Sequence, residues 1–237
     1  MANFHLRASL VAMTIAGGMA GASFGAAVPA AGATASFLRA QRRLEQRLAN
    51  RAAELNRLSA DVKAATQLST SDAATLEARL SAERTSIATL AVTVAQDTSL
   101  HQLMLDQRAM YRDDRVYAVM VPQVLEAIEA DGISAQIATM QAGEATLQAD
   151  VASLAGQPGY RSAAQHYEAF VVSVTNAWRL VINLDAKVIA QIPADFPRDT
   201  RVFVDANRQL LAADVTLAHA SYDETLVGLA SGGSTGA

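Results

Sequence analysis

The chain has 237 residues, a formal net charge of -4 and no cysteine. Without cysteine it can form no disulfide, thiol nucleophile, cysteine-ligated zinc site or cysteine-linked lipid anchor. The mildly acidic balance argues against a general nucleic-acid-binding protein, and an aromatic content of 5% argues against stacking platforms for bases or sugars.

The N-terminus has the layout of a secretory signal peptide. Arg7 supplies a short positive region, and no charged residue follows between positions 8 and 38. Two small-x-small cleavage sites lie in this stretch, at residues 20–22 and 33–35. We therefore expect residues 1–35 to be a leader that directs export to the periplasm or the exterior. The alternative is an uncleaved membrane anchor, because the arginines just downstream favour retention on the cytoplasmic side.

The stretch from Ser36 to Leu68 lacks glycine and proline and carries the clearest helical pattern of the chain. Most of its apolar residues follow alternating steps of four and three, which average three and a half residues, the period of a coiled-coil seam. A helix of this length, about 50 Å, cannot bury its own stripe and needs partner helices. The seam residues are Phe37, Leu44, Leu48, Leu55, Leu58, Val62 and Ala65.

A second face of the same helix carries four arginines spaced four apart, which we name the arginine ridge: Arg39, Arg43, Arg47 and Arg51. Like charges at this spacing repel each other by about 0.2–0.5 kcal/mol per pair. We predict that the ridge binds a partner, which would be an acidic or helical protein or anionic lipid headgroups. The plain alternative is a solvated face, and Arg51 also falls on a seam position.

A polar patch at residues 67–72 separates the first helix from a second amphipathic stretch. The apolar seam changes register there, and Ser71 or Asp72 can cap a new helix. We predict a tight turn and an antiparallel helical hairpin, with one continuous helix as the alternative. The seam residues of the second helix are Leu76, Leu80, Ile87, Leu90 and Val94.

Helical patterns continue up to residues 156–159, where two glycines and a proline predict a loop. We expect the second helix to continue through residues 97–112, and Pro122 to kink or restart the helix that follows. Gly132 is predicted to end that helix as a C-cap, and heptad spacing resumes after it. Residues 36–155 are therefore predicted to form a coiled-coil-like helical hairpin region.

Residues 156–229 are predicted to complete the bundle as an apolar helical hairpin, and residues 230–237 to form a flexible tail. The helix over residues 160–192 is the most apolar of the chain, and we expect it to be the central, most buried one. Its aromatic residues predict core packing, with the wall of a small apolar ligand pocket as the functional alternative. The candidate pocket residues are Tyr167, Phe170 and Trp178.

The sequence contains no catalytic or metal-binding constellation that we expect to act. It has no Glu-x-x-His, no H-E-x-x-H and no Walker-type phosphate loop. Asp97 with His101, and His219 with Asp223, lie four apart on predicted helices, and each pair could supply half of a metal site. Ordinary surface pairs are the alternative. We therefore predict no catalytic residue, no metal and no cofactor.

Together these patterns predict an all-α protein: an elongated helical bundle with coiled-coil-like antiparallel hairpins. The predicted function is that of an exported, non-enzymatic structural or interaction protein of the cell envelope, such as a scaffold, a secretion-system subunit or a holding chaperone. Its expected partner is a protein or a second copy bound through helices, or an acidic lipid surface, and not nucleic acid. The alternatives are a periplasmic bundle that binds a small apolar ligand or a metal, and an enzyme whose site is assembled from distant residues.

Overall fold

The computed structural model describes residues 35–232, and this part of the chain is all-α, with no β-strand. The predicted leader, residues 1–35, lies outside the described residues apart from Ala35. The predicted flexible tail, residues 230–237, is wrong for residues 230–232, because the last helix continues to Gly232, and it lies outside the described residues from 233 onward. None of the described helices has the length and hydropathy of a membrane span. The elements are α1 (Ala35–Ala64), α2 (Thr70–Gln96), α3 (Leu100–Arg112), the π-helical turn η1 (Val116–Met120), α4 (Val121–Ser153), α5 (Tyr160–Val181), α6 (Leu184–Ile189), the 3₁₀ turn η2 (Pro193–Asp195) and α7 (Asp199–Gly232).

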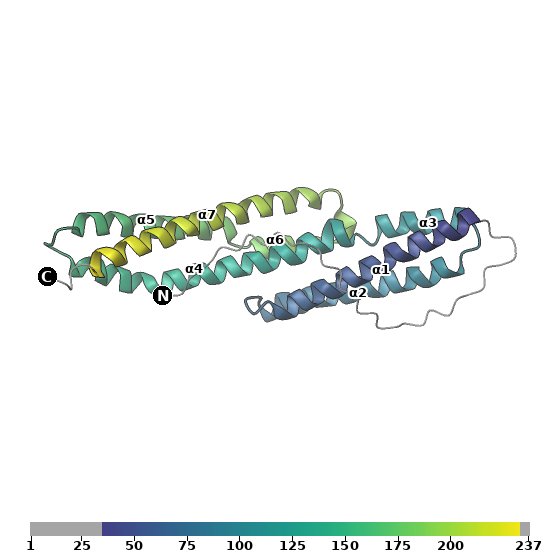
Figure 1. Ribbon diagram of the computed structural model, residues 1–237, viewed down its shortest axis with the longest axis horizontal. Helices are drawn as coiled ribbons and strands as arrows, with labels where there is room; N and C mark the ends of the chain where they lie inside the picture. The colour runs from purple at the N-terminus through teal and green to yellow at the C-terminus, as the bar shows by residue number, and fades with distance from the viewer. Residues whose placement is uncertain (1–34, 233–237) are drawn as a thin grey trace.

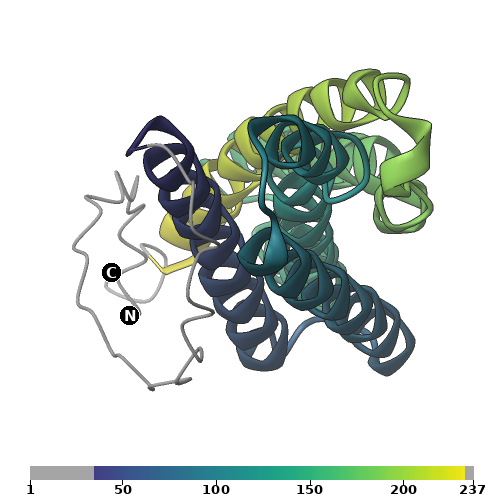
Figure 2. The ribbon, with the colours of Figure 1, turned by 90° about the vertical axis from the view of Figure 1, so that its right-hand side faces the viewer.

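The fold is elongated, with two groups of three helices that follow each other along its long axis (Figure 1). The helices α1, α2 and α3 pack together at one end, and α5, α7 and most of α4 pack together at the other. Figure 2 views the molecule from the end that α1 and α3 form, with the second group behind the first. The predicted elongated helical bundle is therefore confirmed.

The first group contains the predicted antiparallel hairpin of α1 and α2. Most residues of the two predicted seams are buried, and the two helices pack along their length. Ser69 caps α2, because its Oγ accepts a hydrogen bond from the backbone N–H of Asp72 at 3.1 Å. The hairpin is thus confirmed and the single continuous helix is wrong, while the cap lies two residues before the first predicted candidate, Ser71.

The chain turns again at residues 97–99, so the predicted continuation of the second helix through residues 97–112 is wrong. Ser99 caps α3 in the same manner as Ser69 caps α2, with its Oγ accepting from the N–H of Gln102 at 3.3 Å. The serine side chain replaces hydrogen bonds that the first turn of a helix lacks. As a result α3 folds back beside α1 and α2 and completes the first group.

Pro122 and Gly132 act differently on α4. Pro122 lies in the first turn of α4, directly after η1, where its missing N–H costs no helical hydrogen bond, so the predicted restart is confirmed. Gly132 lies inside α4, and the predicted C-cap there is wrong. Burial of neighbours such as Ile133 offsets the cost of about 1 kcal/mol that glycine imposes within a helix. The predicted loop at residues 156–159 is confirmed, with a positive φ of 98° at Gly159.

The central helix of the molecule is α4, which contacts α1, η1, α5, α6 and α7. The expectation that residues 160–192 form this central helix is wrong. That segment breaks after Val181, because Asn183 adopts the left-handed conformation, with a φ of 58°. The six-residue helix α6 then packs against α4.

Two side chains join the groups by binding the end of α6. Arg79 of α2 donates from Nη1 to the carbonyl oxygens of Ile189 and Gln191, the latter at 2.8 Å. The fully buried Gln123 of α4 donates from Nε2 to the same two carbonyls, at 3.1 and 2.7 Å, and to that of Val188 at 3.1 Å. Carbonyls at a helix C-terminus lack partners within the helix, so these donors satisfy them and fix α6 between α2 and α4. We call this arrangement the α6 brace.

Candidate functional site

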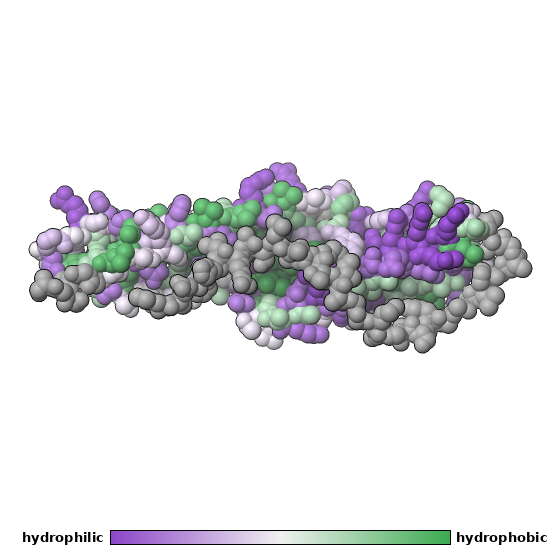
Figure 3. Space-filling view, in the orientation of Figure 1, coloured by the Kyte–Doolittle hydropathy of each residue, from purple (hydrophilic) through white to green (hydrophobic). Residues whose placement is uncertain are grey.

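The arginine ridge occupies the exposed side of the first half of α1. Arg39, Arg43 and Arg47 are exposed, and so is the neighbouring Arg42. None of these four makes an ion pair with another described residue. Figure 3 shows a broad hydrophilic area over α1 at this end of the molecule. Glu45 lies within this stretch but forms no ion pair with these four arginines, so roughly three helical turns present a net positive charge.

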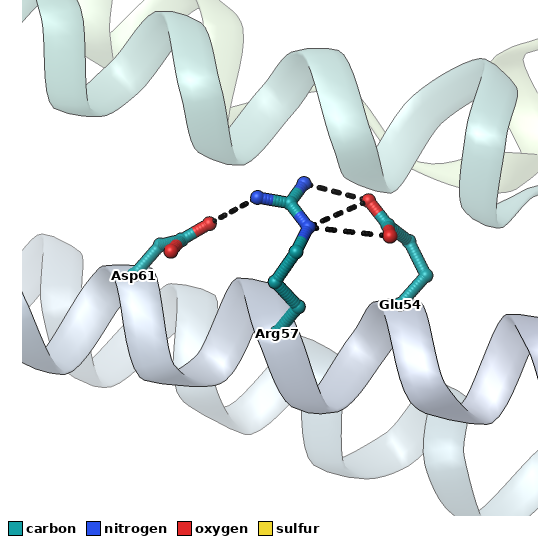
Figure 4. Close-up of polar contacts among 3 residues, drawn as sticks. All are labelled: Glu54, Arg57 and Asp61. Atoms are coloured by element: carbon teal, nitrogen blue, oxygen red, sulfur yellow. Dashed lines mark hydrogen bonds and ion pairs between the residues drawn. The ribbon is translucent and has the colours of Figure 1, made fainter. Parts of the chain in front are cut away.

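The second half of α1 shows how the same helix neutralises an arginine. Arg57 contacts a carboxylate on each side, Glu54 and Asp61, both at 2.6 Å (Figure 4). The spacings are three and four residues, which place the side chains next to each other on the helix surface. Because no carboxylate lies three or four residues from Arg39, Arg43 or Arg47, the charge of these three arginines stays available to a binding partner.

Arg51 does not belong to the exposed ridge, which corrects the prediction for that residue. Its exposed fraction is 7%, and its guanidinium lies 5.3 Å from the ring centroids of both Tyr111 and Tyr117. At that distance the planar cation stacks favourably on aromatic rings. Position 51 continues the apolar seam, so the helical spacing places the side chain inside the packing regardless of its charge.

Arg51 is part of a partly buried polar cluster, in which Arg51 and Asp114 are buried, Glu83 is half-buried and Ser86 is exposed. Asp114 is 3% exposed, and one of its oxygens accepts a hydrogen bond from the hydroxyl of Ser86 at 2.6 Å. Burial raises the pKa of Asp114, while the Ser86 hydrogen bond and the charge of Arg51 act in the opposite direction. Burial, with a smaller effect of Asp114, also raises the pKa of Glu83 to about 7. The cluster can therefore change its charge near neutral pH.

The candidate pocket residues do not share one environment. Phe170 is buried in the core, whereas Trp178 is 45% exposed, so its expected core position is wrong. Tyr167 is half-buried and donates a hydrogen bond to a carboxylate oxygen of Glu144 at 3.3 Å. The buried stripe of α5 passes through Ala177 instead. Binding of a small apolar ligand by these three aromatic residues stays a prediction.

The aspartates of the two predicted aspartate–histidine pairs contact residues outside those pairs. Asp223 of α7 lies 2.8 Å from Nδ1 of His166 on α5, which joins the two helices. Asp97 faces Asp106 of α3, and burial, together with the hydrogen bond and charge of Asp106, raises the pKa of Asp97 to about 6. The described residues contain no group of three or more histidine, aspartate or glutamate side chains placed to share a metal ion.

Sequence analysis missed a second surface, the solvent-facing side of α7, which we name the outer α7 face. Its buried side packs on α5 and α4, yet the opposite side also carries large apolar residues that are between half and two-thirds exposed. The signal was available, because these residues follow steps of seven and four along the chain. The large apolar residues of the outer α7 face are Val204, Leu211, Val215, Tyr222 and Leu229.

Comparisons with known proteins do not assign this fold to a family. No family model, curated protein or solved structure matches the chain. The function must therefore be argued from the two surfaces and the buried groups themselves.

Proposed function

We propose that the protein is a non-catalytic interaction protein of the cell envelope, which binds an acidic protein partner through the exposed part of the arginine ridge. The observation that carries this proposal is the row of Arg39, Arg43 and Arg47, with Arg42 beside them, exposed and without a carboxylate partner among the described residues. The envelope location rests on the sequence of residues 1–35, which has the layout of a secretory leader.

The exposed part of the ridge carries an electrostatic cost in the free protein. Each pair of arginines four apart repels by about 0.2–0.5 kcal/mol. A partner that brings carboxylates to this face removes the repulsion and adds hydrogen bonds to planar guanidinium groups, which suit carboxylates. A row of like charges also attracts an acidic surface at a distance and speeds its association, an effect that salt weakens.

Site-specific cross-linking in the source organism tests this proposal. A photoreactive amino acid replaces Gln46, an exposed residue beside the ridge, and in a control strain it replaces Thr139, an exposed residue of α4. We expect a cross-linked envelope protein with an acidic surface at position 46 and none at position 139. Absence of any cross-link at position 46, with normal accumulation of the protein, would overturn the proposal.

The charge dependence is tested with matched variants of the same strain. The triple variant Arg39→Gln/Arg43→Gln/Arg47→Gln removes the ridge, and we expect it to lose the cross-link at position 46. The control variant Arg57→Gln/Arg112→Gln removes charges that have carboxylate partners of their own, and it should retain the cross-link.

A further inference from the structure

We propose that the outer α7 face is a homodimer interface, at which α7 of a second copy packs antiparallel against α7 of the first. This face lies on α7 and the arginine ridge lies on α1, so the inference stands independently of the acidic partner. Figure 1 shows α7 along the side of the second helical group, and Figure 3 shows apolar side chains exposed over that part of the molecule.

The outer α7 face has the spacing of a coiled-coil seam. Its positions alternate in steps of four and three, the coiled-coil period, over most of the length of α7. The buried side of α7 shows the same period, so the helix has two seams, and among the described residues only one of them is buried. The exposed seam positions are Val204, Arg208, Leu211, Val215, Ala218, Tyr222, Thr225 and Leu229.

The exposed seam of α7 matches a reversed copy of itself. The spacings between successive seam positions are the same in both directions from the midpoint between Thr216 and Leu217. A two-fold axis would pass through this midpoint. Large residues then meet complementary ones, as an isologous interface requires. The facing pairs are Val204 with Leu229, Arg208 with Thr225, Leu211 with Tyr222, and Val215 with Ala218 of the second copy.

The charge of Arg208 favours the antiparallel arrangement of the two copies. In a parallel pair in register, each seam position faces its own copy, so Arg208 would face Arg208 within the contact, which is unfavourable. In the antiparallel pair Arg208 faces a threonine instead. It can also keep its ion pair with Asp205 at the edge of the seam, which is 3.2 Å long in the single chain.

The outer α7 face is large enough for a contact between two copies. Its five large apolar residues are 52%, 58%, 58%, 65% and 67% exposed in chain order. Together they expose on the order of 500 Å² per copy, which is at the upper end of apolar patches on monomeric proteins. Two such faces, with their polar margins, reach the roughly 1,000 Å² or more that a specific interface needs.

Measurement of molar mass tests the proposal on the purified full chain. We expect light scattering after size-exclusion chromatography to give twice the chain mass at high concentration, and sedimentation to show reversible dissociation on dilution. The double variant Leu211→Asp/Val215→Asp should weaken the dimer at least tenfold. The control variant Val172→Asp alters another exposed valine, on α5, and should dimerise as the unmodified chain does. Circular dichroism should show unchanged helicity in both variants, because these side chains are exposed.

Cysteine pairing tests the orientation, and the absence of natural cysteine makes it specific. Leu211→Cys and Tyr222→Cys chains, mixed before oxidation, should form a disulfide-linked heterodimer, because the two positions face each other. Leu211→Cys alone should cross-link poorly, since two copies of position 211 would lie about 16 Å apart along the helices. Efficient cross-linking of that single variant would indicate a parallel pair and overturn the proposed arrangement.

Two results would overturn the interface itself. One is a monomer at every concentration, and the other is a dimer that Leu211→Asp/Val215→Asp leaves intact. A monomer that sediments with lipid vesicles, and no longer does so in the double variant, would assign the outer α7 face to a membrane surface and not to a second copy.

Discussion

The α6 brace should stabilise the fold by more than the summed effects of removing Arg79 and Gln123 one at a time. The variants Arg79→Met, Gln123→Met and the double variant test this, since methionine keeps much of the side-chain volume and removes the donors. The carbonyls of Ile189 and Gln191 each accept from both Arg79 and Gln123. A single substitution therefore leaves each carbonyl one donor, whereas the double variant leaves both without either donor.

The magnitude follows from the geometry. Arg79 is partly exposed, so the loss of its charged hydrogen bonds should cost about 1–2 kcal/mol, below the full range for buried ones. Gln123 is fully buried, but its Oε1 has no donor among the described residues, so methionine also removes an unpaired polar atom. Its loss should cost about 1–2 kcal/mol as well. The double variant should lose about 1–2 kcal/mol more than the sum, because the carbonyls of Ile189 and Gln191 lose both of their side-chain donors.

Urea unfolding followed by circular dichroism measures all four proteins, with Arg57→Gln as a control for an exposed arginine that should cost less than 1 kcal/mol. The reasoning is refuted if the two single effects simply add, or if Arg79→Met costs no more than Arg57→Gln. Additive effects would mean that Arg79 and Gln123 act independently, and an effect of Arg79→Met no larger than that of Arg57→Gln would mean that the hydrogen bonds of Arg79 do not join the groups of helices.

Three further predictions concern single residues. Burial, with a smaller effect of Glu129, raises the pKa of Glu126 to about 8, so the unmodified protein should lose stability as pH rises from about 4.5 to 8. Glu126→Gln stays neutral, and its thermal midpoint should exceed that of the unmodified chain at pH 8 and match it near pH 4. Arg51→Lys should lower the free energy of unfolding in urea by about 1 kcal/mol although the charge is kept, because an ammonium group cannot stack on two tyrosines as a guanidinium does. The control Arg47→Lys should have no measurable effect. Leu55→Ala, at a fully buried seam position, should cost about 2–5 kcal/mol in the same assay.

Helical spacing predicted the local structure better than residue type did. The seam of α1 identified the residues that are buried, and it placed position 51 inside the packing although that residue is an arginine. The residue type alone predicted that Arg51 is exposed, as the fourth member of a basic ridge. The rings that accept Arg51 come from residues 111 and 117, far along the chain, and a pattern within one helix contains no information about them.

The breaks between helices were harder to predict than their seams. No glycine or proline lies at residues 97–99 or at Asn183, yet both places end a helix, while Gly132 lies in the middle of one. Helix caps and tertiary packing decide where these helices end. A cap contributes about 1 kcal/mol, which is as large as the differences in helix propensity on which a sequence-based prediction relies. The α6 brace was not predictable for a related reason: its donors and acceptors lie 65 to 112 positions apart.

The most direct test of the proposed function is the affinity of the cross-linked partner as a function of ionic strength. Titration calorimetry compares the unmodified chain, the variant Arg39→Gln/Arg43→Gln/Arg47→Gln, and the control Arg57→Gln/Arg112→Gln. We predict that Kd for the unmodified chain and the control rises steeply with salt, and that the ridge variant binds at least tenfold more weakly at low salt, with a shallow salt dependence. Equal Kd values for the unmodified chain and the ridge variant at low salt would contradict the proposal that the arginine ridge is the binding surface.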